Sequence, residues 1–263
     1  MSQSWMIASG KGGVGKSLVA ASLGIALARR QLPTVIVDTD IGLRSQDLLL
    51  GLQNKVVYDV VDVAHKDCKL RYALISHNRY PGLSLLPASQ LGTPADLSAE
   101  RLAKIVLKLK KRFAYVLLDA PAGLEGGLRA GIPAADHTLL VTTPDDVAIR
   151  DAERVVSLLE SLQKPRPMLL VNRVDLALVR AGDMYAPQTV ATTLDLPLLG
   201  YLPEDPRVQR ALCRHESIME EDGPTRQAME RVTRRFLGEF VPLPPMPRKR
   251  FFQRRRPAKE VSL

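Results

Sequence analysis

The chain has 263 residues, of which 46% are hydrophobic and 25% are charged. This size and composition fit one large globular domain, and they exclude a collagen-like, repetitive or largely disordered chain. No run of about 18 apolar residues occurs, and residues 1–5 do not begin a signal peptide, so we expect neither a membrane-spanning nor a secreted protein. Cys68 and Cys213 are too far apart in sequence for a redox pair or a metal knuckle, which favours reduced thiols in the cytoplasm.

The positive charge is concentrated at the C-terminal end. Residues 242–263 contain seven basic residues and one acid, so they supply +6 of the formal net charge of +9. Four prolines between positions 242 and 247 are incompatible with a helix. We therefore expect a folded domain over 1–241, followed by a Pro-rich linker and a basic tail over 242–263. The distribution argues against nucleic acid as a partner and indicates a tail that meets an anionic surface.

Short apolar strands alternate with helical segments along the expected domain. The order begins with a strand at 5–8, a glycine-rich loop at 10–15, a helix at 17–30 and a β-branched strand at 34–38. Further strands are predicted at 83–86, 115–119, 138–141, 168–171 and 198–202, and helices at 98–113, 145–162 and 224–237. This alternation predicts an α/β fold with a doubly wound, mostly parallel sheet, helices on both faces, and a ligand at the carboxyl ends of the strands.

The loop between the first strand and the first helix has the pattern G-x-x-x-x-G-K-[ST]. Its residues are Gly10, Lys11, Gly12, Gly13, Val14, Gly15, Lys16 and Ser17. In such a loop, backbone N–H groups and the helix dipole bind phosphate oxygens. Lys16 is expected to contact the β- and γ-phosphates, and Ser17 is expected to bind Mg²⁺. Because the loop lies between a strand and a helix, as this mechanism requires, we predict a P-loop nucleotide site.

A second lysine and three acidic residues extend this prediction to hydrolysis. Since Lys16 already neutralises phosphate charge, Lys11 is most useful if it reaches phosphates bound by another subunit, which predicts a nucleotide-sandwich homodimer. Asp119 ends the strand at 115–119, the position of a Walker B carboxylate that holds Mg²⁺. Asp38 and Asp40 follow the strand at 34–38; we assign Asp38 to the metal and Asp40 to orienting the attacking water.

Six stretches of the chain resemble the septum-positioning branch of the ParA/MinD family of deviant Walker A ATPases. They are KGGVGKS, DTDIGLRSQDLLLGL, VVYDVVDV, LLPASQ, VLLDAPAGLEGGLRAGIPAADHTLLVTTP and GYLPEDP. The resemblance implies an ATPase that uses ATP and Mg²⁺, dimerises with ATP, and binds the cytoplasmic face of the inner membrane. It also implies recruitment of a MinC-like division inhibitor that restricts FtsZ ring placement, and a MinE-like or other regulator that stimulates hydrolysis. An alternative is a ParA-like ATPase that positions DNA or another cargo.

The same resemblance assigns further nucleotide contacts. They are Leu18 beside the phosphate loop, Asn172 and Arg173 at the base, and Pro203, Glu204 and Asp205 lining the adenine pocket. The run from Asn172 to Asp175 also echoes the guanine-reading N-K-x-D of GTPases, although the family favours ATP. The helix around Arg150, Asp151 and Arg154 corresponds to the surface where partner proteins dock.

The chain departs from the family pattern at four places. Leu18 stands where relatives often have Thr, Ser45 where Asn is common, and Ala120 where Ser is frequent. The tail departs most, because the family usually ends in an amphipathic helix rich in Phe and Leu. Here the expected membrane contacts are Arg248, Lys249, Arg250, Phe251, Phe252, Arg254, Arg255 and Arg256. Cations near an anionic leaflet contribute on the order of 1 kcal/mol each, and two tails in one dimer would bind with avidity.

Overall fold

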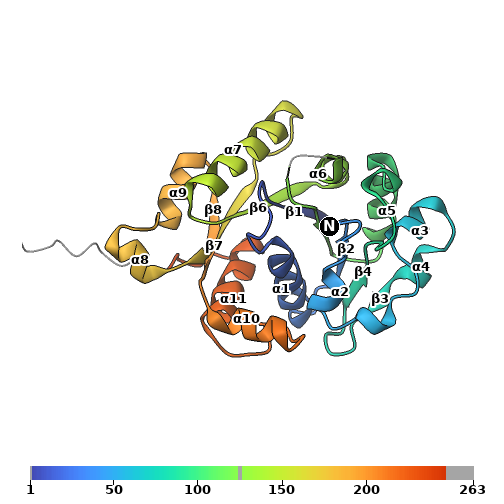
Figure 1. Ribbon diagram of the computed structural model, residues 1–263. Coiled ribbons are helices and arrows are strands. Elements are labelled where there is room, and N and C mark those ends of the chain that lie inside the picture. Colours follow the sequence, from blue (N-terminus) through green and yellow to red (C-terminus); the bar gives the residue numbers. More distant parts are fainter. Residues whose placement is uncertain (1, 124–125, 247–263) are drawn as a thin grey trace, which may run out of the picture.

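The sheet determines where the nucleotide loop lies. The computed structural model describes residues 2–123 and 126–246. Their strands form one eight-stranded sheet in the order β3-β4-β2-β5-β1-β6-β7-β8 (Figure 1). The strands are β1 (Gln3–Ala8), β2 (Thr34–Asp38), β3 (Ile75–Ser76), β4 (Leu83–Leu86), β5 (Tyr115–Asp119), β6 (His137–Thr142), β7 (Met168–Val174) and β8 (Leu198–Pro203). Every pairing is parallel except that of β3, the short edge strand, with β4. The predicted doubly wound fold is confirmed.

Helices cover both faces of the sheet. They are α1 (Lys16–Arg29), α2 (Gln46–Leu49), α3 (Val60–His65), α4 (Leu70–Ala73), α5 (Ala99–Leu109), α6 (Gly126–Gly131), α7 (Asp146–Ser161), α8 (Leu176–Ala181), α9 (Pro187–Leu194), α10 (Pro206–Cys213) and α11 (Pro224–Phe236). Short 3₁₀ turns occur at Gln53–Lys55, Pro94–Asp96 and Ile132–Ala134. In Figure 1, α1 and α11 lie below the sheet, whereas α5, α6, α7 and α9 lie above it.

Strand alternation divides the core into two clusters. Along β1, Met6 and Ala8 face the cluster that contains α5 and α7, while Trp5 and Ile7 face the cluster that contains α1 and α11. Successive side chains on a strand point to opposite faces, so a strand buried on both sides is apolar at every position. This explains why the strands appear in the sequence as continuous apolar runs rather than as alternating patterns.

The central position of β1 creates the crevice for a ligand. β1 pairs with β5 on one side and with β6 on the other. The chain leaves β1 toward β2, on the β5 side, whereas the connection from β5 to β6 runs in the opposite direction, which makes this the switch point of the sheet. In the register of the sheet, Asp119 lies opposite Ile7 of β1 and opposite Asp38 of β2. The phosphate loop after β1 and the acids of β2 and β5 are thereby brought to one edge of the sheet.

The segment after α11 returns along the edge strand β8. The Arg235 guanidinium donates hydrogen bonds to the backbone oxygens of Val241 (2.6 Å), Pro242 (2.8 Å) and Leu199 of β8 (3.0 Å). Met246 packs against the core cluster on the α5 and α7 side. The first residues of the expected linker therefore contact the body of the domain, and the predicted tail from Arg248 to Arg256 lies outside the described residues.

No helix in the described residues is long and apolar enough to cross a membrane.

Candidate nucleotide site

The phosphate loop is shaped by glycine at its turns and by close packing on α7. Gly13 and Gly15 have φ values of 78° and 92°, in the left-handed region that favours glycine. Gly15 begins α1, and a Cβ there would lie 2.3 Å from Asn172 Nδ2. At Gly10, a Cβ would lie 2.2 Å from the backbone oxygen of Asp151 in α7. The loop is thus fixed between the end of β7 and the docking helix predicted from the resemblance.

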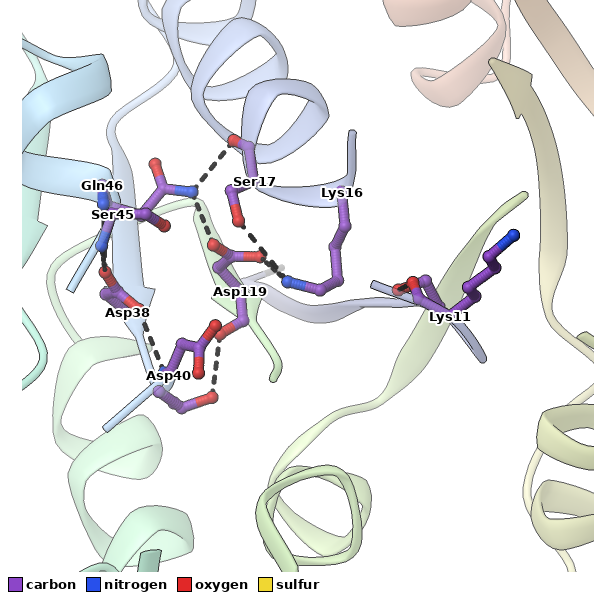
Figure 2. Close-up of polar contacts among 10 residues, drawn as sticks. Lys11, Lys16, Ser17, Asp38, Asp40, Ser45, Gln46 and Asp119 are labelled. Carbon is purple, nitrogen blue, oxygen red and sulfur yellow. Dashed lines mark hydrogen bonds and ion pairs between the residues drawn. The ribbon is translucent and has the colours of Figure 1, made fainter. Parts of the chain in front are cut away.

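Lys16 and Asp119 form a buried ion pair inside this loop. Lys16 Nζ lies 2.9 Å from Asp119 Oδ1 and 3.4 Å from Ser17 Oγ (Figure 2). The side chains of Lys16 and Asp119 are 7% and 0% exposed. The structure therefore brings together the three residues that the sequence assigns to phosphate and metal binding.

Asp38 organises the turn that follows β2. Its Oδ1 accepts a hydrogen bond from the Asp40 N–H, and its Oδ2 accepts from the N–H groups of Ser45 and Gln46, each at 3.0 Å. Burial and then the charge of Asp119 raise the pKa of Asp38 to about 7, although the backbone donors oppose this shift. Asp38 is placed beside Asp119 as predicted, and it also caps α2, a role that the sequence pattern did not indicate.

Asp40 lies at the more open side of the site. Burial and the charge of Asp119 raise its pKa, while Lys16 acts in the opposite direction. A half-buried carboxylate of raised pKa at the mouth of a phosphate site is suited to holding a water by hydrogen bonding.

Lys11 occupies a different environment from Lys16. It is exposed, lines a surface cavity of about 500 Å³ together with Thr143, Asp145 and Arg173, and points away from the Asp119 carboxylate (Figure 2). Of the two lysines of the loop, Lys16 is therefore buried in the site and Lys11 is exposed at the surface.

The residues assigned to the base share one small cavity of about 150 Å³. It is lined by Gly15, Leu18, Asn172, Arg173, Pro203, Glu204 and Asp205, with residues of α10. The Asn172 amide is buried and donates a hydrogen bond to the Val14 oxygen at 2.7 Å. Asp205 caps α10 by accepting from the Arg207 N–H, and it accepts a second hydrogen bond from the Thr225 hydroxyl. Both side chains thus have structural partners in addition to the predicted nucleotide contacts.

One buried residue of the site was missed in the sequence analysis. Gln46, the first residue of α2, donates from Nε2 to Asp119 Oδ2 at 2.7 Å and to the Ser17 oxygen at 2.9 Å. The sequence signal for it is its place in the stretch after Asp38, directly after Ser45.

The donor set fits Mg²⁺. The described residues contain no group of three His, Cys, Asp or Glu side chains arranged to hold a metal. Mg²⁺ is commonly held by few protein oxygens, with waters and substrate phosphates completing its coordination. The Ser17 hydroxyl and the Asp119 carboxylate are such oxygens, and both lie beside Lys16 Nζ, at 3.4 Å and 2.9 Å.

The predicted docking surface lies on α7, directly above the phosphate loop. Arg150 and Arg154 are exposed, and Arg154 pairs with Asp151 at 3.3 Å. The backbone of Asp151 is the part of α7 that approaches Gly10.

A strand, a glycine loop with a buried lysine, a helix and a carboxylate at the end of a neighbouring parallel strand define a P-loop nucleotide hydrolase. The extra lysine at position 11 is the mark of its deviant Walker A group. The chain belongs to the CobQ/CobB/MinD/ParA nucleotide binding domain family, whose model matches residues 5–218, and it is a P-loop ATPase.

Its similarities lie in the MinD branch of that family. The chain is 41% identical over 242 residues to the septum site-determining protein MinD of Helicobacter pylori, covering 89% of this chain and 90% of that protein. Its fold matches MinD in the MinC:MinD cell division complex of Aquifex aeolicus, with a TM-score of 0.86 and 36% identity over 94% of this chain and 100% of that one. It also matches MinD of Pyrococcus horikoshii complexed with Mg-ADP, with a TM-score of 0.81 and 25% identity over 90% of this chain and 96% of that one. The predicted resemblance is confirmed.

Proposed function

We propose that this chain is an ATP-driven, MinD-like regulator of division-site placement. ATP binding drives formation of a homodimer, the dimer binds the cytoplasmic face of the inner membrane, and it recruits a MinC-like inhibitor that restricts the FtsZ ring. A MinE-like or other regulator stimulates hydrolysis and resets the cycle. Support comes from the similarity to MinD proteins, one of which was solved in a complex with MinC and another with Mg-ADP.

The single observation that carries this proposal is the different placement of the two lysines. Lys16 is buried against Asp119, next to the loop that receives the phosphates, so it serves the nucleotide of its own subunit. Lys11 is exposed and points outward, so it is free to serve a nucleotide held by a second subunit. An isolated hydrolase has no need for the outer lysine, whereas a switch that completes its site by dimerisation does.

The residues of the site divide the chemistry among them. On nucleotide binding, Lys16 moves from Asp119 to the phosphates, and the loop N–H groups hold the phosphate oxygens. Ser17 and Asp119, with Asp38 beside Asp119, would hold Mg²⁺, which neutralises phosphate charge when bound. Asp40 orients the attacking water, and Lys11 of the second subunit stabilises the charge that develops in the transition state. Asp38 keeps the turn before α2 in place through its three backbone hydrogen bonds.

Membrane and partner contacts are assigned to two other parts of the chain. The basic tail beyond the described residues supplies the charge and the phenylalanines for an anionic membrane surface. The exposed face of α7 around Arg150 and Arg154 supplies the surface for the division inhibitor. Because two tails act together in a dimer, nucleotide-dependent dimerisation would control residence on the membrane.

The test is to measure dimerisation and vesicle binding with the same protein samples. We expect the full chain to form dimers and to sediment with anionic vesicles in a non-hydrolysable ATP analogue, but not in ADP. Lys16→Ala should lose nucleotide binding and both assemblies. Lys11→Ala should retain nucleotide binding as a monomer. Lys108→Ala is the matched control, because Lys108 is an exposed lysine on α5, far from the site in sequence. This variant should behave as the wild type.

The two measurements separate the steps of the proposal. A wild-type chain that stays monomeric when saturated with the analogue contradicts the dimer. Equal sedimentation with vesicles in the analogue, in ADP and for Lys16→Ala contradicts the nucleotide switch, even if dimers form.

A further inference from the structure

Gln46 is the one residue of α2 that reaches into the phosphate and metal site. It has no exposed surface, and its backbone N–H is fixed by Asp38 Oδ2 at 3.0 Å. Its side-chain Nε2 donates to Asp119 Oδ2 at 2.7 Å and to the Ser17 backbone oxygen at 2.9 Å (Figure 2). One amide therefore joins three segments far apart in sequence: the turn after β2, the start of α1 and the end of β5.

The orientation of this amide is determined by chemistry. Both groups that face its nitrogen, a backbone carbonyl and a carboxylate, are acceptors, so only the NH₂ end can satisfy them. The oxygen Oε1 must then point the other way, where it is buried and has no partner in the described residues. The Asp119 carboxylate and the Ser17 carbonyl therefore determine which way the amide faces.

The two oxygens of Asp119 are held by different kinds of donor. Lys16 occupies Oδ1 at 2.9 Å, and Gln46 occupies Oδ2. Lys16 is the group that the phosphates attract, so its contact with Oδ1 is broken on nucleotide binding. The Gln46 contact involves no phosphate ligand and persists. Asp119 is then left with one oxygen held in place and the other one free to accept a hydrogen bond from a metal-bound water.

We propose that Gln46 is a positioning residue for the magnesium site, because its Nε2 holds the Asp119 carboxylate in its metal-binding orientation. Residues that orient a metal-binding carboxylate through hydrogen bonds change metal affinity by about 10–100-fold when they are removed. The inference rests on the nucleotide chemistry of the site and not on the proposed role in cell division.

The test measures binding of a fluorescent ADP to the full-length chain, with free Mg²⁺ titrated and with EDTA present. Gln46→Leu keeps the side-chain volume and removes both polar ends. We expect the Mg²⁺ concentration at half-maximal binding to rise about tenfold or more, while affinity in EDTA changes less than about twofold. Gln53→Leu is the matched control, because Gln53 lies in the 3₁₀ turn just after α2 and should leave both values unchanged.

A structural role alone predicts a different result. In that case Gln46→Leu lowers the melting temperature and weakens ADP binding equally with Mg²⁺ and in EDTA, which overturns the proposal. An unchanged Mg²⁺ midpoint also overturns it. If Gln46→Leu fails to fold, Gln46→Asn retains the amide but shortens its reach, and the same Mg²⁺-dependent shift is required. Each outcome is independent of dimerisation, so failure here is distinguishable from failure of the proposed function.

Discussion

The contact between Gly10 and α7 yields a quantitative prediction for Gly10→Ala. The new Cβ would lie 2.2 Å from the backbone oxygen of Asp151 and 2.3 Å from its carbonyl carbon, whereas ordinary contacts begin near 3.4 Å. The loop and the helix must therefore separate by roughly 1 Å, and the obstructing atoms are helical backbone that cannot rotate away. We expect the free energy of unfolding to fall by about 3 kcal/mol, the upper end of the cost of overpacking.

Gly12→Ala is the matched control from the same loop. Among the described residues, a Cβ at position 12 lies within 4 Å of Ala122 Cβ alone, at 3.9 Å, so the free energy of unfolding should change by less than about 0.5 kcal/mol. Urea denaturation of the nucleotide-free proteins, followed by circular dichroism, compares the two variants without involving phosphate binding. Equal stability of Gly10→Ala and Gly12→Ala would refute the inferred packing of the loop on α7.

Three further predictions concern other parts of the domain. Lys16→Ala leaves Asp119 buried without its cation, and urea denaturation at neutral pH should show a loss of about 3 kcal/mol that Asp119→Asn in the same chain partly restores. Arg235→Ala removes hydrogen bonds to three backbone oxygens, so limited proteolysis should cut within 241–246 faster than in the wild type. Burial lowers the pKa of His77 below its usual 6.5, so the neutral ring stabilises the fold above that pH. This contribution to stability should be lost as the pH falls through the lowered pKa of His77. An NMR titration of the imidazole checks the pKa. Urea denaturation at several pH values checks the stability, which should depend less on pH in His77→Gln than in the wild type.

The sequence predicted the parts of the fold whose signals are local. Strands buried on both faces are apolar throughout, so β2 and β5 were found with the bounds that the structure has. The phosphate loop was found because its glycines, Lys16 and Ser17 are adjacent in the chain. Asp119 was found because a parallel sheet brings the carboxyl ends of its strands to one edge. The edge strand β3 was missed, since two residues carry no periodicity.

The parts that were missed depend on contacts between distant residues. Nothing in the neighbourhood of Gln46 indicates that its amide will meet a carboxylate 73 positions later in the chain. The backbone hydrogen bonds of Asp38 depend on how the turn before α2 folds, and a run of acids after a strand does not specify that turn. The prolines after position 241 correctly predicted that helix α11 ends before residue 242. They do not show where the segment 241–246 packs on the domain.

The fixed segment 241–246 affects how far anything attached to it can extend. A free chain spans at most about 3.3–3.6 Å per residue, so the six residues of this segment, held at Val241, Pro242 and Met246, shorten the reach of the chain beyond the domain by up to about 20 Å. The chain therefore leaves the described domain from the face where Met246 packs, and not from the end of α11. Through its hydrogen bonds to Val241 and Pro242, Arg235 thereby determines where on the domain the last 17 residues of the sequence begin.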